Sequence, residues 1–265
     1  MRMSGLMIRQ SDGIPWEPHA LPGSIRKVLA TDKRTGSYVH RRYVFPGSVP
    51  QPARRYHRSV RETFLFLWGH LPSWEFNDVA DTEGHFVEFR RGTFMDRPPF
   101  SIHGRHPEAK SVTGCEFLIW TSHGGEFEAD PLESEQVPFS GPSGVAPFSA
   151  TQVVVIDTES LDWVDHPSLD GVSTKVLSRE SPGGGGIDPV VLVYLPPSWP
   201  SRNLSLTFTE RGWAYVVAGS MRLANTSWEV GTFASWATAT GQDSGPRAVG
   251  REGCLCLTVG RGFSL

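Results

Sequence analysis

The sequence contains few cysteines, no excess of basic residues and no long apolar run. Three cysteines in 265 residues are too few for a disulfide framework, which favours a reducing compartment. The chain has 25 Lys and Arg against 28 Asp and Glu, so it lacks the basic excess by which dedicated nucleic-acid-binding proteins neutralise phosphates. The longest apolar run, residues 190–195, is far shorter than the roughly 20 residues of a membrane-spanning helix.

Aromatic residues and turn-forming residues are abundant instead. Nine Trp and 15 Phe provide enough apolar surface for a buried core, while 28 Gly and 21 Pro indicate many turns. Residues 1–16 do not form the apolar stretch of an export signal, because Arg9, Gln10 and Asp12 interrupt it. We therefore expect a cytoplasmic protein that binds neither nucleic acid nor a membrane.

Several residue patterns of the first half recur in the same order in the second half. The matching segments are Trp16 with Trp163, Lys27-Val28-Leu29 with Lys175-Val176-Leu177, Gly69 with Gly219, Gly92-Thr93-Phe94 with Gly231-Thr232-Phe233, and Gly114-Cys115 with Gly253-Cys254. This conserved order indicates a duplicated fold. The offset falls from 150 residues at Gly69 to 139 at Gly92, and the difference of 11 predicts a loop insertion between these glycines in the first half.

The apolar segments of both halves are short, rich in β-branched and aromatic residues, and bounded by Gly or Pro. They cover residues 38–45, 63–68, 85–89, 116–121, 153–156, 190–195, 213–217 and 255–259. This spacing is typical of antiparallel sandwiches or barrels. Residues 126–150 are rich in Gly, Pro, Ser and acidic residues, which predicts a connection. We expect an all-β fold with barrels over residues 1–130 and 151–265, joined by a linker at 131–150.

The first half also carries a characteristic spacing of histidine, glutamate, glycine and proline. The residues concerned are His57, Glu62 and Gly69, followed by Gly92, Pro98 and His103. They resemble the two motifs of the cupin superfamily, G-x5-H-x-H-x3-4-E-x6-G and G-x5-P-x-G-x2-H-x3-N. Together with the repeat, this resemblance covers both halves and implies a bicupin, in which each half is a jelly-roll β-barrel.

Three positions depart from these motifs. Arg55 stands where the first motif has its first histidine, Phe100 where the second motif has a glycine, and Pro107 where it has an asparagine. The first departure leaves three of the four metal ligands of the family.

The resemblance implies a metal site formed by His57, Glu62 and His103. Two imidazoles and one carboxylate are the ligand set of non-haem Fe(II) oxygenases, so Fe(II) is favoured, with Mn, Ni, Zn and Cu as alternatives. In an extended strand Glu62 shares one face with Phe64, Phe66 and Trp68, which predicts an aromatic pocket around the metal.

The repeat provides an internal control for this site. At the offsets of 150 and 139, the counterparts of His57, Glu62 and His103 are Thr207, Gly212 and Gln242, which do not form a ligand set. A second barrel that does without these residues indicates that barrel packing does not require them. We therefore expect a metal in the first half only.

Three further residues are candidates for a catalytic role. Arg55 either anchors a substrate carboxylate or enolate, or belongs to the solvated basic run of residues 54–61. His40 either points into the barrel as a fourth ligand or general base, or is an ordinary strand histidine. Tyr56 is a candidate base, together with His40 and Tyr43, if the metal acts without oxygen.

The leading functional hypothesis is a metal-dependent dioxygenase that acts on a small oxygenated organic substrate, as in the quercetinase-like and diketone-cleaving cupins. The first alternative is a metal-dependent isomerase or lyase, which consumes no dioxygen. The second is a non-catalytic bicupin that binds a small ligand. A homodimer is compatible with all three, because barrels with exposed edge strands often pair.

Overall fold

The computed structural model describes most of the chain. The described residues are 6–48, 55–57, 60–77, 81–99, 101–104, 110–121, 129–131, 153–167, 169–178, 188–199, 207–208, 211–223, 226–236, 240–241, 246–260 and 263–264.

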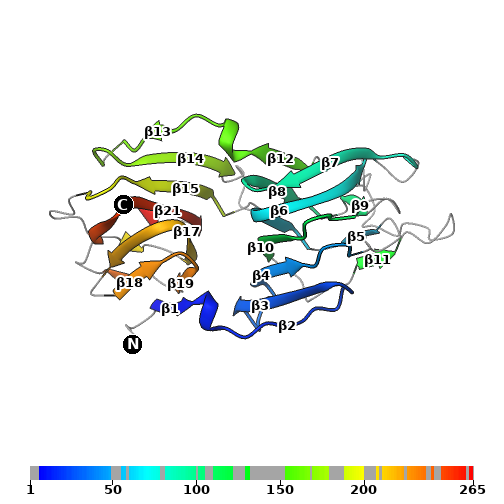
Figure 1. Ribbon diagram of the computed structural model, residues 1–265, viewed down its shortest axis with the longest axis horizontal. Helices are drawn as coiled ribbons and strands as arrows, with labels where there is room; N and C mark the ends of the chain where they lie inside the picture. The colour runs from blue at the N-terminus through cyan, green and yellow to red at the C-terminus, as the bar shows by residue number, and fades with distance from the viewer. Residues whose placement is uncertain are drawn as a thin grey trace. The chain divides into compact units, whose positions relative to one another are not determined.

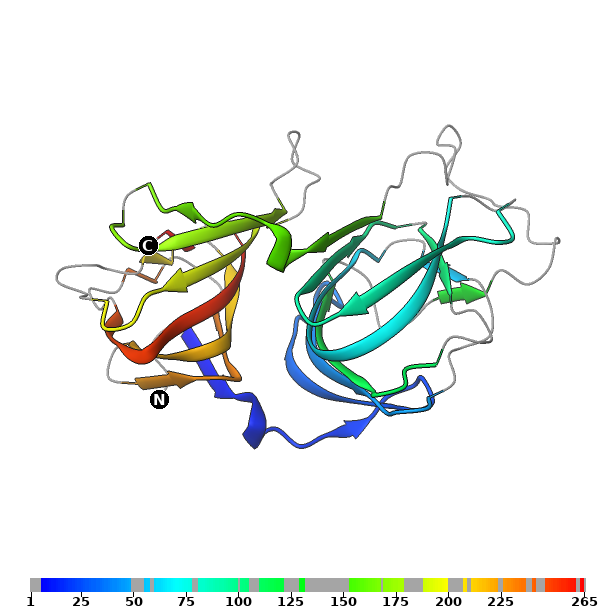
Figure 2. The same cartoon turned by 45° about the horizontal axis from the view of Figure 1, so that its top comes forward.

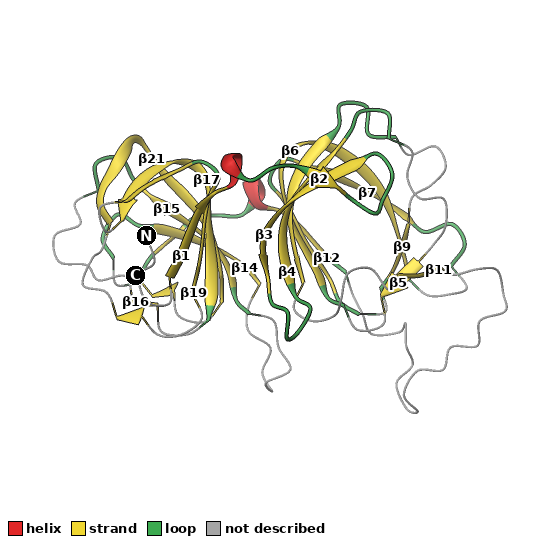
Figure 3. Cartoon of the chain, turned by 90° about the horizontal axis from the view of Figure 1, so that it is seen from below, coloured by secondary structure: helices red, strands yellow, loops and turns green. Residues whose placement is uncertain are grey.

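The described elements are nearly all antiparallel β-strands, which confirms the predicted all-β fold class. The helical segments η1 (Ser11–Gly13) and η2 (Thr158–Ser160) are single 3-10 turns, shown in red in Figure 3. Among the described residues, no helix has both the length and the apolar character needed to cross a membrane.

The chain forms two compact units, of which Pro15–Asp157 is here called the first barrel. Its strands are β2 (Glu17–Pro18), β3 (Ser24–Thr31), β4 (Tyr38–Val44), β5 (Arg55–His57), β6 (Glu62–Phe76), β7 (His85–Arg90), β8 (Thr93–Arg97), β9 (Ile102–Gly104), β10 (Cys115–Thr121), β11 (Ala129–Pro131) and β12 (Val154–Asp157). They join in the order β11-β5-β9-β6-β10-β4-β3-β2, with β7 and β8 on β6, and β12 on β8. Figure 2 shows these strands curving around a common interior.

The second barrel combines Met1–Ile14 with Thr158–Leu265. Its strands are β1 (Leu6–Gln10), β13 (Val164–Asp165), β14 (Ser173–Ser178), β15 (Val190–Leu195), β16 (Thr207–Phe208), β17 (Gly212–Leu223), β18 (Thr226–Glu229), β19 (Thr232–Trp236), β20 (Thr240–Gly241), β21 (Pro246–Gly260) and β22 (Phe263–Ser264). The main sheet has the order β1-β19-β17-β21-β15-β14-β13, and β18 pairs with β17. A small sheet has the order β20-β16-β22.

These units differ from the predicted ranges at the first strand of each repeat. Strand β1 starts the chain but pairs with β19 of the second barrel, and β12 starts the second repeat but pairs with β8 of the first barrel (Figure 1). Each repeat therefore contributes its first strand to the barrel that the other repeat forms. The apolar pattern of a single strand does not indicate which of two similar sheets it joins, so the sequence did not show this exchange.

Matched glycines show the repeat at atomic level. Gly69 and Gly219 both have positive φ angles, 79° and 70°. A Cβ atom on Gly69 would lie 2.1 Å from the carbonyl oxygen of Gly114, and one on Gly219 would lie 2.0 Å from that of Gly253. Glycine is required at both positions because only its backbone adopts this conformation without strain and allows so close an approach.

The predicted insertion between Gly69 and Gly92 lengthens a hairpin, in the segment that connects its strands and also in the strands themselves. Strand β6 continues beyond Gly69 and pairs with β7 from His70 opposite Arg90 to Glu75 opposite His85. The corresponding hairpin of the second barrel, β17 with β18, is shorter. The prediction placed the end of the strand at Gly69 because glycine commonly bounds strands, but here it allows the strand to continue past a close contact.

The predicted common face of Glu62, Phe64, Phe66 and Trp68 holds for the first three residues only. Phe64 and Phe66 are buried in the core, whereas Trp68 is 49% exposed. The register between β6 and β10 shifts between Phe66 and Trp68, which adds one unpaired residue to β6. Such a β-bulge reverses the alternation of side chains, so Trp68 faces outward.

Candidate metal centre

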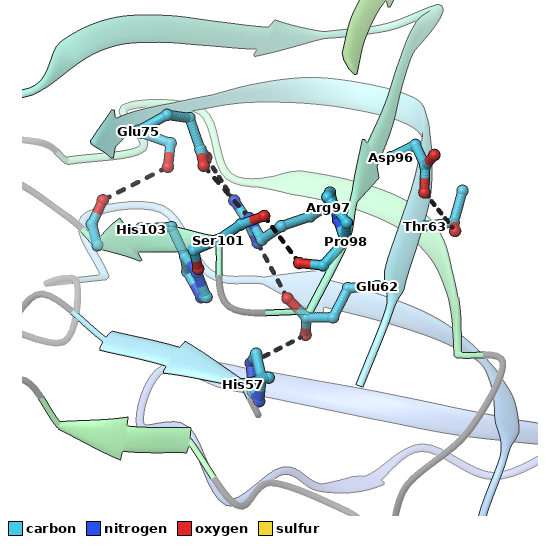
Figure 4. A network of polar contacts seen from close by, with 11 residues as sticks. His57, Glu62, Thr63, Glu75, Asp96, Arg97, Pro98, Ser101 and His103 are labelled. Carbon is cyan, nitrogen blue, oxygen red and sulfur yellow. Dashed lines mark hydrogen bonds and ion pairs between the residues drawn. The ribbon is translucent and has the colours of Figure 1, made fainter. Parts of the chain in front are cut away.

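Three strands of the first barrel bring His57, Glu62 and His103 together. His57 ends β5, Glu62 begins β6 and His103 is the middle residue of β9. All three side chains are at most 4% exposed. Figure 4 shows them converging on one point inside the barrel.

The ligand atoms of these residues are close enough to hold one ion. One atom from each residue lies within 4.8 Å of the others, and Nε2 of His57 is 3.6 Å from Oε1 of Glu62. Ligands at about 2.1 Å from one ion lie roughly 3–4 Å apart, so this pair fits the donors of a divalent transition metal. The rings of His57 and His103 are 5.4 Å apart and nearly parallel, with an interplanar angle of 22°.

The orientation of His103 favours metal binding through Nε2. Its Nδ1 lies 3.2 Å from the carbonyl oxygen of Ser101, which can only accept a hydrogen bond. Nδ1 therefore carries the proton, and the lone pair lies on Nε2. Fixing the tautomer by a backbone carbonyl is a common arrangement for metal-binding histidines.

Arg97 holds Glu62 from the side opposite His57. Its Nη1 donates to Oε2 of Glu62 at 3.0 Å, and its Nε donates to Oε2 of Glu75 at 3.3 Å, while Nη2 donates to the other oxygen of Glu75 (Figure 4). Burial lowers the pKa of Arg97, but the attraction of Glu75 and Glu62 outweighs it and the pKa is raised. Burial raises the pKa of the Glu75 carboxyl above its ordinary value, although Arg97 opposes this shift.

A pocket adjoins these residues inside the barrel. It encloses about 700 Å³ of space that atoms do not fill, including the part open to solvent. Glu62, Arg97, His103 and Arg42 contribute polar groups to its wall, and much of the remaining wall is apolar, with Phe64, Phe66, Phe89, Phe117, Met95 and Leu71. This mixture of many apolar and few polar groups is typical of small-molecule sites.

Of the three predicted catalytic candidates, His40 is the one whose side chain is described. His40 lies in the barrel interior, fully buried and stacked on Tyr38 with ring centroids 4.1 Å apart, but it is not one of the three clustered ligands. Burial, followed by the charges of Arg26, Arg42 and His19, lowers the pKa of His40 to about 2, so its imidazole is neutral at physiological pH.

The side chains of the other two candidates, Arg55 and Tyr56, lie outside the described residues. Only their backbone is described, in β5, where Arg55 pairs in register with His103. Their roles stay predictions.

Sequence reasoning missed Arg97, Glu75 and Arg42. Arg97 directly precedes the motif proline, and Arg42 is two residues beyond His40, so strand alternation could have placed both on the inner face. No comparable signal exists for Glu75, because it belongs to the lengthened hairpin and has no counterpart in the repeat.

The second barrel fills the corresponding position with an aromatic side chain. Glu62 pairs in register with Arg97, and the equivalent pair is Gly212 with Trp236. A Cβ atom on Gly212 would lie 2.8 Å from the indole of Trp236, which is 2% exposed. The indole thus covers the site from which the counterpart of Glu62 would project.

Comparison with known proteins supports the fold. Neither a family model nor a curated protein sequence matches the chain. A proposed dioxygenase from Nostoc punctiforme is structurally similar, with a TM-score of 0.67 and 14% identity over 98% of this chain and 84% of that one. A variant of Bacillus subtilis oxalate decarboxylase has a TM-score of 0.64 and 13% identity over 100% of this chain and 79% of that one.

A third similar structure is protein Ylba of E. coli, with a TM-score of 0.59 and 13% identity over 99% of this chain and 89% of that one. These neighbours are cupin-fold proteins. At such identities the likeness establishes the fold, and the predicted arrangement of two cupin-type barrels is confirmed.

Proposed function

We propose that the protein is a metal-dependent cupin enzyme whose ion is held by His57, Glu62 and His103. The observation that carries this proposal is the convergence of three buried ligand atoms within 4.8 Å beside a pocket. Two neighbours add support, since one is described as an oxalate decarboxylase and another as a proposed dioxygenase.

Fe(II) is the metal we favour, because two histidines and one carboxylate leave positions open for other ligands. Mn, Ni, Zn and Cu bind to the same donor atoms. When bound, such an ion supplies a Lewis acid for an oxygenated substrate and, in the case of iron, redox chemistry with dioxygen.

The residues of the barrel prepare this centre in two ways. Arg97 and the carbonyl of Ser101 fix the orientation of Glu62 and His103, so that Oε1 and Nε2 face the site. The aromatic wall formed by residues such as Phe64 and Phe66 limits the access of water to the reacting groups.

The reaction we propose is the dioxygenation of a small oxygenated organic substrate, in the manner of the quercetinase-like and diketone-cleaving cupins. A metal-dependent lyase is the second candidate. The similarity to oxalate decarboxylase favours this candidate, because its TM-score of 0.64 is close to the 0.67 of the proposed dioxygenase.

Oxygen uptake separates these reactions. Fe(II)-reconstituted protein is screened against diketones, catechols and flavonols with an oxygen electrode, beside the Glu62→Ala variant. Uptake that depends on substrate and is lost in the variant supports the dioxygenase. Product formation without uptake indicates the lyase, and ligand binding with no turnover indicates a non-catalytic bicupin.

A further inference from the structure

We propose that Glu75 is a positioning residue of the metal centre, because it holds the guanidinium of Arg97, which in turn holds Glu62 with one oxygen, Oε1, toward the ion. This proposal deepens the proposed function and rests on it for the presence of a metal. It is carried by the hydrogen bonds of Arg97, by the pairing of β6 with β9 and by the comparison of the two barrels.

Glu75 binds one edge of the Arg97 guanidinium with both of its oxygens. Nε of Arg97 donates to Oε2 at 3.3 Å, and Nη2 donates to Oε1 (Figure 4). Because both oxygens accept a hydrogen bond, the group binds as a carboxylate, and the residue is 1% exposed. A two-point contact of this kind fixes the plane of a guanidinium, which a single hydrogen bond does not. Glu75 therefore determines where the remaining nitrogen, Nη1, points.

Nη1 of Arg97 points at the carboxylate of Glu62. It donates to Oε2 at 3.0 Å, whereas Oε1 lies on the side of His57, 3.6 Å from its Nε2. One oxygen of Glu62 thus binds the arginine, and the other faces the ligand cluster. A guanidinium released from Glu75 is able to turn its free edge to Glu62 and bind both oxygens, which competes with the ion for Oε1. The carboxylate of Glu75 prevents this competition.

The segment that supplies Glu75 also pairs with the strand of His103. The two residues lie directly opposite each other on β6 and β9, so their side chains project from the same face of the sheet. Strand β6 continues for seven residues beyond Gly69, but β17 continues for four beyond Gly219. Among the described strands of the second barrel, β16, the counterpart of β5, lies in a small sheet with β20 and β22 that does not pair with β17. The extended strand and the ligand cluster therefore occur in the same copy of the repeat.

The test compares the Co(II) affinity and the visible Co(II) spectrum of wild type with those of Glu75→Gln. The amide has the shape of the carboxylate but no charge, and it offers one acceptor oxygen instead of two. We expect the affinity to fall at least about ten-fold, with a changed spectrum, because residues that orient a metal ligand contribute about 10- to 100-fold. Glu75→Asp keeps the charge but is one methylene shorter, so its affinity should lie between the two. Urea unfolding shows that each variant is folded, and Glu75→Asp provides the test if Glu75→Gln is not.

A double-mutant cycle shows whether Glu75 acts through Arg97. In the Arg97→Met background, Glu75→Gln should not weaken Co(II) binding further, because the residue through which Glu75 acts is already absent. An equal loss in both backgrounds overturns the proposal, as do a wild-type affinity and spectrum in the folded Glu75 variants.

Two substitutions near Glu75 provide controls. Glu88→Gln removes a 51% exposed carboxylate of the same hairpin, which pairs with His70 at 2.8 Å, and His85→Gln removes the imidazole opposite Glu75 on β7. Both should leave the affinity for Co(II) unchanged, and a loss in either that equals the loss in Glu75→Gln overturns the proposal. If wild type does not bind Co(II), the proposed function fails and this assignment with it. If wild type and folded Glu75→Gln bind Co(II) equally, the assignment alone fails.

Discussion

Nη1 of Arg97 lies 3.0 Å from Oε2 of Glu62, and the two residues face each other across β8 and β6. The same register position of the second barrel holds Trp236 opposite Gly212. One position of a duplicated fold therefore carries a buried ion pair in one copy and an indole over a glycine in the other. The candidate metal centre, formed by His57, Glu62 and His103, belongs to the copy with the ion pair.

Removal of the Arg97 side chain should destabilise the protein strongly. Arg97→Met leaves two buried carboxylates, Glu62 and Glu75, without their cation, so we expect a loss of about 3–5 kcal/mol in the free energy of unfolding. The double variant Arg97→Met/Glu75→Gln should recover part of this loss, because one of the two charges is then absent. Urea unfolding measures both effects.

The control for this experiment is Arg90→Gln. Arg90 forms an ion pair with Asp157 in which the side chains are 63% and 35% exposed. We expect this substitution to cost about 1 kcal/mol or less. Equal losses for Arg90→Gln and Arg97→Met would contradict the role assigned to the buried network.

Arg97 should also govern the affinity for metal. Residues that orient a metal ligand typically contribute about 10- to 100-fold to metal affinity, so Arg97→Met should weaken Co(II) binding by that factor. Arg97→Lys should restore part of it, since a cation again faces Glu62. Titration followed by the visible Co(II) spectrum measures both the affinity and the ligand geometry. An unchanged affinity and spectrum in folded Arg97→Met would refute this role.

His40 should make stability depend on pH below neutrality. Its pKa is about 2 in the folded protein and near 6.5 in the unfolded chain, so between these values the unfolded state binds more protons. Stability is therefore fully present above pH 6.5 and falls as the pH decreases, by up to about 1.4 kcal/mol per pH unit.

The His40→Leu variant isolates this contribution. Between pH 6.5 and 4, the free energy of unfolding of the variant should fall less steeply than that of wild type. The difference between the two slopes should approach the value for one bound proton, about 1.4 kcal/mol per pH unit. Denaturant titrations at a series of pH values give the two slopes. Identical slopes would show that His40 is not buried in its neutral form.

The close glycine contacts of the two barrels should be equally intolerant of a side chain. Gly69→Ala and Gly219→Ala place a Cβ atom about 2 Å from a carbonyl oxygen at a positive φ angle. We expect each to cost about 2–3 kcal/mol. Gly13→Ala is the control, because no atom lies within 4 Å of its added Cβ. Thermal unfolding that leaves Gly69→Ala at the wild-type midpoint would contradict this expectation.

The sequence predicted the repeat, the all-β class and the three clustered residues because each has a local signature. His57, Glu62 and His103 lie at motif spacing, and the paired glycines such as Gly69 and Gly219 recur at a fixed offset. Strand alternation correctly placed Phe64 and Phe66 beside Glu62.

The remaining features depend on interactions that are not local. A bulge between Phe66 and Trp68 reverses the face of Trp68, and its position is set by the pairing with β10 rather than by β6 itself. Glu75 reaches the site because a hairpin is lengthened, and β1 joins a sheet formed by residues far along the chain. None of these pairings leaves a periodic pattern or a motif in the sequence.

The most direct test of the account is the metal content of protein purified without an affinity tag. The His57→Ala/Glu62→Ala double variant is compared by elemental analysis with His70→Ala/Glu88→Ala, which removes an exposed His–Glu pair with 2.8 Å between Nε2 and Oε1. We predict close to one transition-metal ion per chain in wild type and in the His70/Glu88 variant, and none in the His57/Glu62 variant. Metal that persists in the His57/Glu62 variant, or its absence from wild type after anaerobic reconstitution with Fe(II), would contradict the account.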